Sequence, residues 1–381
     1  MKNKNLLVAI VFFGVILFSV STATAKVSGP CVDCHTMHFS QTPWPTEWGA
    51  SGPNAALLVN DCVGCHSGAA ALKGTSNEIP VVLRTVAPSG TGAGKSLAGG
   101  DFYWVDAGNS TNGHDVIDLP NISGADGNLG MTPPGWNATA TPGALGDGQI
   151  AGGAGTWTSQ LTCAGTYGCH GRHDVADNAG AVSGGHHGDD SCLKPGTVDQ
   201  SAQGADIKTS YRWLGGIEGI EDDDWEYTAT DGTVDHNQYK GVSTNLHFSD
   251  KTTISYLCAE CHGDFHSGIG GTASPWLRHP TDIQLPSDTS KEYQYYNGGT
   301  GGGAACDYSV IAPVGSTTFA DDDYPEAQIT PGTTDSIVLC ISCHRAHGTE
   351  YPDLLRWDYD DMIAGKSSTP NEGCFICHTT K

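Results

Sequence analysis

The run Cys31-Val-Asp-Cys-His-Thr-Met-His38 contains a Cys-x-x-Cys-His pattern that returns four more times along the chain. The five copies are Cys31/Cys34/His35, Cys62/Cys65/His66, Cys258/Cys261/His262, Cys340/Cys343/His344 and Cys374/Cys377/His378. Two cysteines at this spacing can each form a thioether with a haem vinyl group, and the adjacent imidazole then reaches the iron from one face. The pattern therefore predicts covalently attached haem c at each copy.

The same cysteine spacing has other uses in proteins. A Cys-x-x-Cys pair forms half of many zinc sites and also forms redox-active disulfides. Neither use requires a histidine directly after the second cysteine. All five copies in this chain have that histidine, so haem attachment is the interpretation that we adopt.

A sixth candidate site departs from this pattern. Five residues, rather than two, separate Cys163 from Cys169, and His170 follows directly. Gly165 and Gly168 allow the backbone to bend back so that both cysteines reach one haem, which is the arrangement that we expect. Two alternatives stay open: a haem held by Cys169 alone with Cys163 in a disulfide, or no haem at this position.

Two of the 14 cysteines, Cys192 and Cys306, lie outside these six sites. In an exported protein two remaining cysteines most simply form a disulfide, and we predict a bond between Cys192 and Cys306. The rival pairing joins Cys163 to Cys192. It would accompany a third haem that is held by a single thioether.

A low-spin, six-coordinate haem needs a second axial ligand, and ten of the 16 histidines lie outside the motif positions. Three of them follow a motif in the order Cys-His-x-x-His, and a fourth comes one residue later. A histidine held there cannot comfortably reach the iron beside it, so we expect it to bind a different haem. With two further histidines, the predicted distal set is His38, His114, His173, His266, His279 and His347. The four that we treat as ordinary loop histidines are His186, His187, His236 and His247.

The first 25 residues have the features of a secretory signal peptide. Lys2 and Lys4 precede an apolar run that ends at Val20, and small residues follow at Ala23 and Ala25. A membrane anchor is the alternative, but the apolar run is short for a bilayer span. We therefore expect cleavage before Lys26, and no later stretch is long and apolar enough for an integral membrane span.

The formal charge of −24 becomes −26 once the two lysines of the signal peptide are removed. This acidity argues against nucleic acid or an anionic lipid surface as a partner. It is compatible with basic partners, cations, mineral surfaces or simple solubility.

The composition predicts a fold that is mostly irregular coil, with short helices, few short strands and a core made of haem. The chain contains 52 glycines and 19 prolines and has few long periodic segments. We expect one extended domain over 26–381, with haems 1 and 2 in 26–160, haems 3 and 4 in 161–280, and haems 5 and 6 in 330–381. Locally we expect single-turn helices at the haem motifs, a longer helix over 351–365, and strands over 79–86 and 252–257.

The motifs together resemble a known family, the OmcS-type hexahaem cytochromes that polymerise into extracellular nanowires. The resemblance covers the mature chain in one order and is carried by CVDCHTMH at 31–38, GDFYWV at 100–105, GHDV at 113–116, RWLGG at 212–216, CAECHGDFH at 258–266, LRHP at 277–280, CISCHRAHG at 340–348 and a last CxxCH near the C-terminus. The wide spacing from Cys163 to Cys169 and the extra cysteines Cys192 and Cys306 depart from the family pattern.

The resemblance implies six bis-histidine haems stacked in one continuous chain along a filament. It also implies that His38 is donated across the subunit boundary to the Cys340/Cys343 haem of the next copy. The histidines that match the family are His38, His114, His173, His266, His279 and His347, which agrees with the set reached by counting ligands.

We therefore expect extracellular electron transfer by a secreted or cell-surface cytochrome that passes through the periplasm and has no enzymatic activity. Its partners would be further copies of itself, other cytochromes or mineral acceptors. One alternative is a monomeric electron shuttle in which His38 binds within its own chain or not at all. A second is a multihaem reductase, which needs an iron with an open position, whereas the histidine supply here is sufficient for six irons.

Overall fold

A computed structural model describes residues 30–37, 57–73, 79–88, 96–136, 156–183, 186, 213–222, 224–243, 250–266, 279–288, 292–319, 325–363 and 372–378. The predicted signal peptide, the ligand candidate His38 and the cysteine Cys192 lie outside these ranges.

The described chain is mostly coil joined by very short elements, as the composition predicted. The α-helices are α1 (Cys62–Cys65), α2 (Tyr103–Asp106), α3 (Asn178–Ala181), α4 (Ile254–Ala259) and α5 (Gly263–His266). The 3-10 turns are η1 (Cys31–Asp33), η4 (Ser110–Asn112), η10 (Glu292–Gly298), η11 (Cys340–Ser342), η12 (Pro352–Leu354) and η13 (Gly373–Ile376). No helix in the described ranges is long and apolar enough to cross a membrane.

The largest sheet has five strands in the order β7-β8-β11-β13-β9, formed by β7 (Gly219–Ile220), β8 (Gln238–Lys240), β11 (Val314–Ser316), β13 (Ile337–Val338) and β9 (Ile283–Gln284). Only β8 and β11 run parallel in it. Four two-stranded pairs complete the set: β1 (Ser67–Gly68) with β4 (Leu83–Arg84), β2 (Leu72–Lys73) with β3 (Ile79–Pro80), β5 (Thr162–Ala164) with β6 (Gly168–His170), and β10 (Cys306–Asp307) with β12 (Gln328–Ile329).

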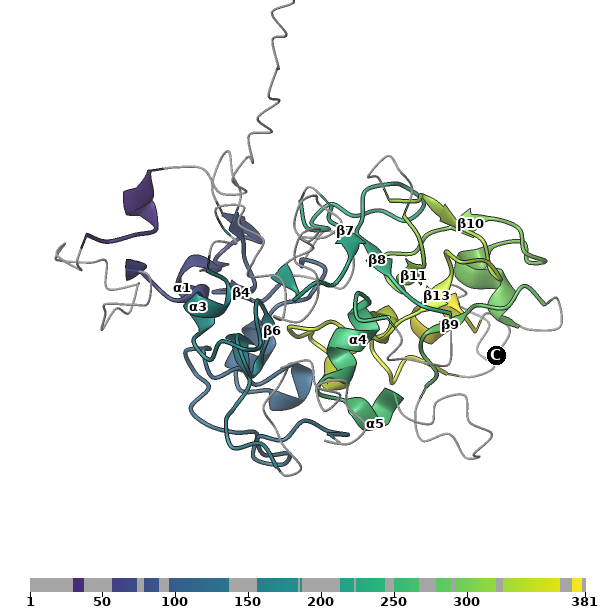
Figure 1. The fold of residues 1–381 in the computed structure, drawn as a ribbon. Coiled ribbons are helices and arrows are strands. Elements are labelled where there is room, and N and C mark those ends of the chain that lie inside the picture. The colour runs from purple at the N-terminus through teal and green to yellow at the C-terminus, as the bar shows by residue number, and fades with distance from the viewer. Residues whose placement is uncertain are drawn as a thin grey trace, which may run out of the picture.

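Figure 1 shows the N-terminal part of the chain, with α1, α3 and β6, on one side and the five-stranded sheet on the other. Three clusters of buried apolar side chains fill these regions, and each cluster contacts haem-motif cysteines. Cys163 packs against the cluster around Val105, and Cys169 against the cluster around Leu339. Cys343, Cys374 and Cys377 pack against the third cluster. The attachment cysteines therefore lie at the edges of the apolar clusters.

The helix predicted over 351–365 is wrong, because only η12 forms there. Asp353 and Leu354 have φ angles of 60° and 58°, which are incompatible with an α-helix. Their carbonyls accept hydrogen bonds from His344 Nδ1 (2.8 Å) and from the Arg345 backbone N–H (2.9 Å). The backbone of this segment is thus bonded to the fifth haem motif rather than to itself.

The two predicted strands also differ from the structure. Residues 252–257 contribute to α4, because the Thr253 hydroxyl accepts a hydrogen bond from Tyr256 N (3.2 Å) and caps the helix. Of the β-branched residues that suggested a strand, Ile254 is buried in this helix and Thr253 is its buried N-cap. The run over 79–86 forms two separate short strands, β3 and β4, which pair with different partners.

Candidate haem-binding sites

The five Cys-x-x-Cys-His segments fold into the same helical turn. In each, the backbone N–H of the histidine donates to the carbonyl of the first cysteine, four residues earlier, at 2.8–3.2 Å. Residues three apart on a helical turn lie on the same face, so both thiols project to one side. This is the arrangement that two thioethers to one haem require.

The third site reaches a similar arrangement with strands in place of a helical turn. Cys163 lies in β5 and Cys169 in the parallel strand β6. Thr162 is opposite Gly168, and Ala164 is opposite His170, so the two cysteines are neighbours across the pair. Neighbouring strands are about 4.8 Å apart. The wide spacing in sequence therefore becomes a short distance in space.

Two glycines make this loop possible. Gly165 has a φ angle of 86°, and a Cβ atom there would lie 2.7 Å from the Val175 carbonyl oxygen. A Cβ atom at Gly168 would lie 2.5 Å from the backbone of Ala164. Both positions need a residue without a side chain, as the sequence suggested.

Several of the predicted ligand histidines are oriented by a backbone carbonyl. The Nδ1 atoms of five of them lie 2.6–2.9 Å from carbonyl oxygens: His66 with Pro80, His114 with Ala346, His262 with Pro134, His279 with Pro280, and His344 with Asp353. Since a carbonyl only accepts, Nδ1 carries the hydrogen and Nε2 keeps a lone pair for a metal. Burial lowers the pKa of His66 and of His114, which favours the neutral, ligating imidazole.

Three predicted distal histidines face three predicted proximal ones. The ring centroids are 6.2 Å apart for His114 and His262, 6.3 Å for His170 and His347, and 6.0 Å for His279 and His378. A fourth facing pair joins His66 to His186, with centroids 6.4 Å apart. The sequence analysis placed His186 among the ordinary loop histidines, because the Ser-Gly-Gly-His-His-Gly stretch does not follow a motif; only the folded path of the chain brings it beside His66.

These separations match the size of an iron atom held between two imidazoles. A metal–imidazole bond is about 2.0 Å long, and a ring nitrogen lies about 1.15 Å from its centroid when the ring bonds are about 1.35 Å. Two rings on opposite sides of one metal then have centroids about 6.3 Å apart. The four observed pairs, at 6.0–6.4 Å, fit this value.

The other predicted ligands are placed differently. His38 lies outside the described residues, as does the side chain of His266 at the end of α5. His35 lies beside Leu58 in an isolated β-bridge. His344 has no second histidine ring facing it among the residues that the structure describes.

His173 is buried and lies in a different environment. Its Nδ1 atom is 3.4 Å from a carboxylate oxygen of Glu260, which is also buried and belongs to the Cys258/Cys261 motif. Burial lowers the pKa of His173 to about 4 and raises the pKa of Glu260 well above its usual range. Burial thus favours the neutral imidazole of His173 and disfavours the charged form of Glu260.

Among the histidines set aside as ordinary, His236 is fully buried rather than exposed on a loop. Its two ring nitrogens lie 2.7 Å and 3.1 Å from the carbonyl oxygens of Asn237 and Glu326. Its ring stacks on Tyr308 at 3.7 Å. Both nitrogens thus lie against carbonyl oxygens, which leaves neither of them open to a metal. His187 and His247 lie outside the described residues.

Three glycines meet where the fifth motif crosses residues 99–114, and we call this contact the glycine junction (Gly100, Gly113 and Gly348). A Cβ atom on Gly100 would lie 2.1 Å from the Gly348 carbonyl oxygen, and one on Gly113 would lie 2.5 Å from the His347 carbonyl oxygen. Hydrogen bonds from His347 N to Gly99 O (2.7 Å) and from Asp101 N to Gly348 O (2.9 Å) fasten the two segments. The junction therefore positions both His114 and His347.

Motif cysteines lie near cysteines of the next motif in the order of the sequence. The neighbouring Cys163 thiol lowers the pKa of Cys62, and the neighbouring Cys340 thiol raises the pKa of Cys258. Burial and then a neighbouring thiol raise the pKa of three further cysteines, which places them beside the next motif or the previous one: Cys65 beside Cys34, Cys261 beside Cys169, and Cys343 beside Cys374. Each of the first five sites thus lies near the site that follows it.

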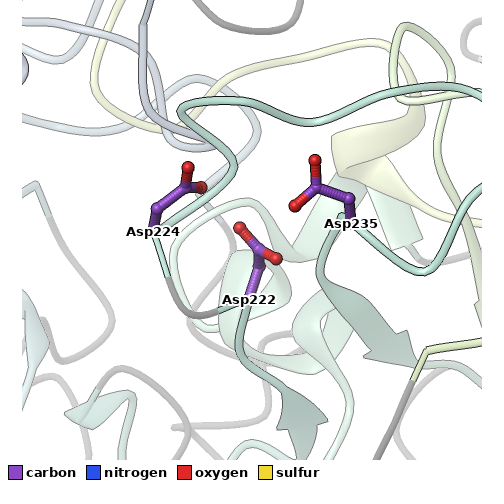
Figure 2. A group of neighbouring side chains, drawn as sticks. All are labelled: Asp222, Asp224 and Asp235. Carbon is purple, nitrogen blue, oxygen red and sulfur yellow. The ribbon is translucent and has the colours of Figure 1, made fainter.

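A separate acidic group lies away from the motifs. The carboxylates of Asp222, Asp224 and Asp235 point toward one another, with ligand atoms within 4.8 Å (Figure 2). The Thr228 hydroxyl donates to Asp224 at 2.6 Å. Burial and the neighbouring Asp224 raise the pKa of Asp222 to about 7, so a proton retained on Asp222 relieves the repulsion at neutral pH.

Comparisons with known proteins identify similar cytochromes. The family described as a doubled CXXCH motif matches residues 331–381. The C-type cytochrome OmcS of Geobacter sulfurreducens is 25% identical over 385 residues, which cover 90% of this chain and 82% of that protein. Two solved structures are similar in part: the Outer Membrane Cytochrome S filament (17% identity, 88% of this chain and 85% of that one, TM-score 0.39) and the OmcS nanowires of the same organism (19%, 87% and 84%, 0.40).

The chain is thus similar to the OmcS-type multihaem cytochromes along nine tenths of its length, as the order of motifs predicted. The motifs and this similarity support covalently bound haem c.

Proposed function

We propose that the protein is an extracellular electron carrier with six covalently attached haems arranged in one chain. The observation that carries this proposal is that motif cysteines lie near those of the next motif along the whole series. Because each cysteine would hold a vinyl edge of its haem, this order would place successive haems side by side. The haems supply the electron-accepting irons, and the protein determines their spacing and axial ligation.

Axial ligation supports a carrier in preference to a reductase. At four sites a second imidazole lies at the distance that one iron would occupy between two rings. Carbonyl acceptors on Nδ1 hold several of these rings in the ligating tautomer. An iron closed on both faces has no position for a substrate, so these sites transfer electrons without substrate chemistry.

The fifth site supports assembly into a filament. The ring of His344 has a carbonyl on Nδ1 and faces no histidine of the described residues. In the proposed assembly, His38 of a neighbouring copy fills this position. A ligand donated from one copy to the next makes a head-to-tail contact that need not close, and such contacts produce filaments.

Export follows from the predicted signal peptide, and the similarity to OmcS supports a place outside the cell. The strongly acidic chain would remain soluble there and would not bind anionic lipid surfaces.

The first test is the intact mass of the haem protein from its own host, which should equal the chain without residues 1–25 plus six haems. The second is electron microscopy of His38→Ala beside Met37→Ala, a matched control because Met37 is 70% exposed and adjacent. We expect fibres from wild type and Met37→Ala, and discrete particles with one five-coordinate haem from His38→Ala. Normal fibres from His38→Ala would exclude the donated ligand.

A further inference from the structure

We propose that His186 is the second axial ligand of the haem on Cys62, Cys65 and His66. This inference rests on the proposed function, since it assumes that the second motif carries a haem. It adds a ligand that neither the motif spacing nor the family pattern supplied. It also removes His186 from the set of ordinary loop histidines.

The geometry of the pair is that of the sites predicted independently. The His66 and His186 rings have centroids 6.4 Å apart and planes at 42°. The corresponding values are 6.2 Å and 39° for His114 and His262. The carbonyl of Pro80 accepts from His66 Nδ1 at 2.9 Å, which leaves Nε2 of His66 to bind a metal.

The ring of His186 is supported from behind by an aromatic side chain. Trp213 contacts it with ring centroids 4.2 Å apart and planes at 60°. Trp213 has a φ angle of 56°, a conformation that costs free energy in a residue with a bulky side chain. Its carbonyl accepts a hydrogen bond from Gly171 N at 2.7 Å, which ties Trp213 to the third haem site.

The segment that leads to His186 is itself anchored. Arg172 N donates to the Ala181 carbonyl at 3.0 Å and closes the loop that contains α3. Asp177 caps α3 by accepting from Gly180 N at 2.6 Å. His186 follows five residues after this closed loop. The third haem site thus delivers the distal ligand of the second.

Two other described histidines outside the motifs do not face His66. The ring nitrogens of His236 lie against two carbonyls, and His173 Nδ1 lies 3.4 Å from a carboxylate oxygen of Glu260. His187 lies outside the described residues, and its place next to His186 in the sequence makes it the natural control.

The experiment compares His186→Ala with His187→Ala in the full-length haem protein, matured in a host that attaches haem c. Resonance Raman spectra and carbon monoxide binding report the number of haems with an open axial position. We expect His186→Ala to gain one high-spin haem that binds carbon monoxide, and added imidazole to restore the low-spin spectrum. His187→Ala should match wild type.

A fully low-spin His186→Ala protein, or a change in His187→Ala alone, would overturn the assignment. If His186→Ala does not accumulate, His186→Met gives a second test, because methionine replaces the ligand and raises the potential of a bis-histidine haem. One haem of raised potential supports the assignment, and an unchanged set of potentials refutes it. The proposed function fails separately, if the wild-type protein carries no covalent haem.

Discussion

Replacing Gly113 with alanine should disturb the third and fourth haem sites together. Gly113 has an extended backbone that any residue can adopt, so the obstacle is space alone. The new Cβ atom would lie 2.3 Å from a methyl of Val105 and 2.5 Å from the His347 carbonyl oxygen. Ordinary carbon contacts are roughly 3.5–4.0 Å, so the two segments must separate by about 1 Å.

Overpacking of this kind costs about 1–3 kcal/mol. The separation acts on two ligands at once, because His114 follows Gly113 directly and His347 carries the obstructing carbonyl. A shift of about 1 Å is half the length of a metal–imidazole bond of about 2.0 Å, which is enough to lengthen or break it.

The assay is the fraction of high-spin haem, with carbon monoxide binding as the independent count. Gly113→Ala should gain up to two haems with an open axial position, namely the haems attached beside His170 and His262, which would lose His347 and His114. The control is Gly124→Ala, where a Cβ atom meets nothing within 4 Å and the spectrum should be that of wild type. A Gly113→Ala protein that is less stable but fully low-spin would refute the claim that the glycine junction positions the ligands.

Three further predictions concern other parts of the chain. The His279 and His378 rings are nearly perpendicular, at 86°, whereas the other facing pairs are at 39–42°. Perpendicular imidazoles act alike on both π-type d orbitals of an iron between them, so this haem should give its own highly anisotropic low-spin signal in electron paramagnetic resonance. The signal should be lost in His279→Ala. Arg345 is buried and donates to Ser96 Oγ and the Leu97 carbonyl at 3.0 Å and 2.8 Å. Arg345→Gln removes a positive charge beside the fifth motif, and it should lower the reduction potential of one haem by on the order of tens of millivolts in a spectroelectrochemical titration. The control is Arg172→Gln, which should give a smaller shift because Arg172 is half-exposed and paired with Asp174. Burial and Asp224 raise the pKa of Asp222 to about 7, so the stability that its proton contributes is full below the usual carboxyl range and is lost as the pH rises through 7. At pH 8, Asp222→Asn should therefore unfold at a higher denaturant concentration than wild type, with a free energy of unfolding that is higher by at most a few kcal/mol. Equal midpoints at pH 8 would contradict the shift.

The attachment segments could be identified from sequence because thioether chemistry imposes a short, fixed spacing on them. The histidines at 114, 279 and 347 could be proposed as ligands because each lies in a short distinctive stretch. His186 could not, since its partner is decided by how residues 171–183 fold back after the third site. A contact between residues so far apart in the chain leaves no pattern in the sequence around either residue.

The incorrect secondary-structure predictions have a related cause. Local propensity favoured a strand over 252–257, but the Thr253 cap and burial against the fifth motif favour α4. Pro352 and Gly365 suggested the start and end of a helix over 351–365, but the carbonyls of Asp353 and Leu354 accept hydrogen bonds from His344 and Arg345. In both places the tertiary environment of a haem motif prevails over short-range preference.

The facing histidines also have a consequence for how the chain reaches its folded state. The partners in the four pairs are separated by 120, 148, 177 and 99 positions in sequence. A bond through one iron closes a loop of that size, and in the chain-entropy account a cross-link across about 100 residues is worth about 4–5 kcal/mol. Coil this rich in glycine gains much from such closures, since few local contacts restrain it. Each iron is then a long-range staple as well as a redox centre, and maturation becomes a folding step: the chain can close only the loops whose haems have already been attached.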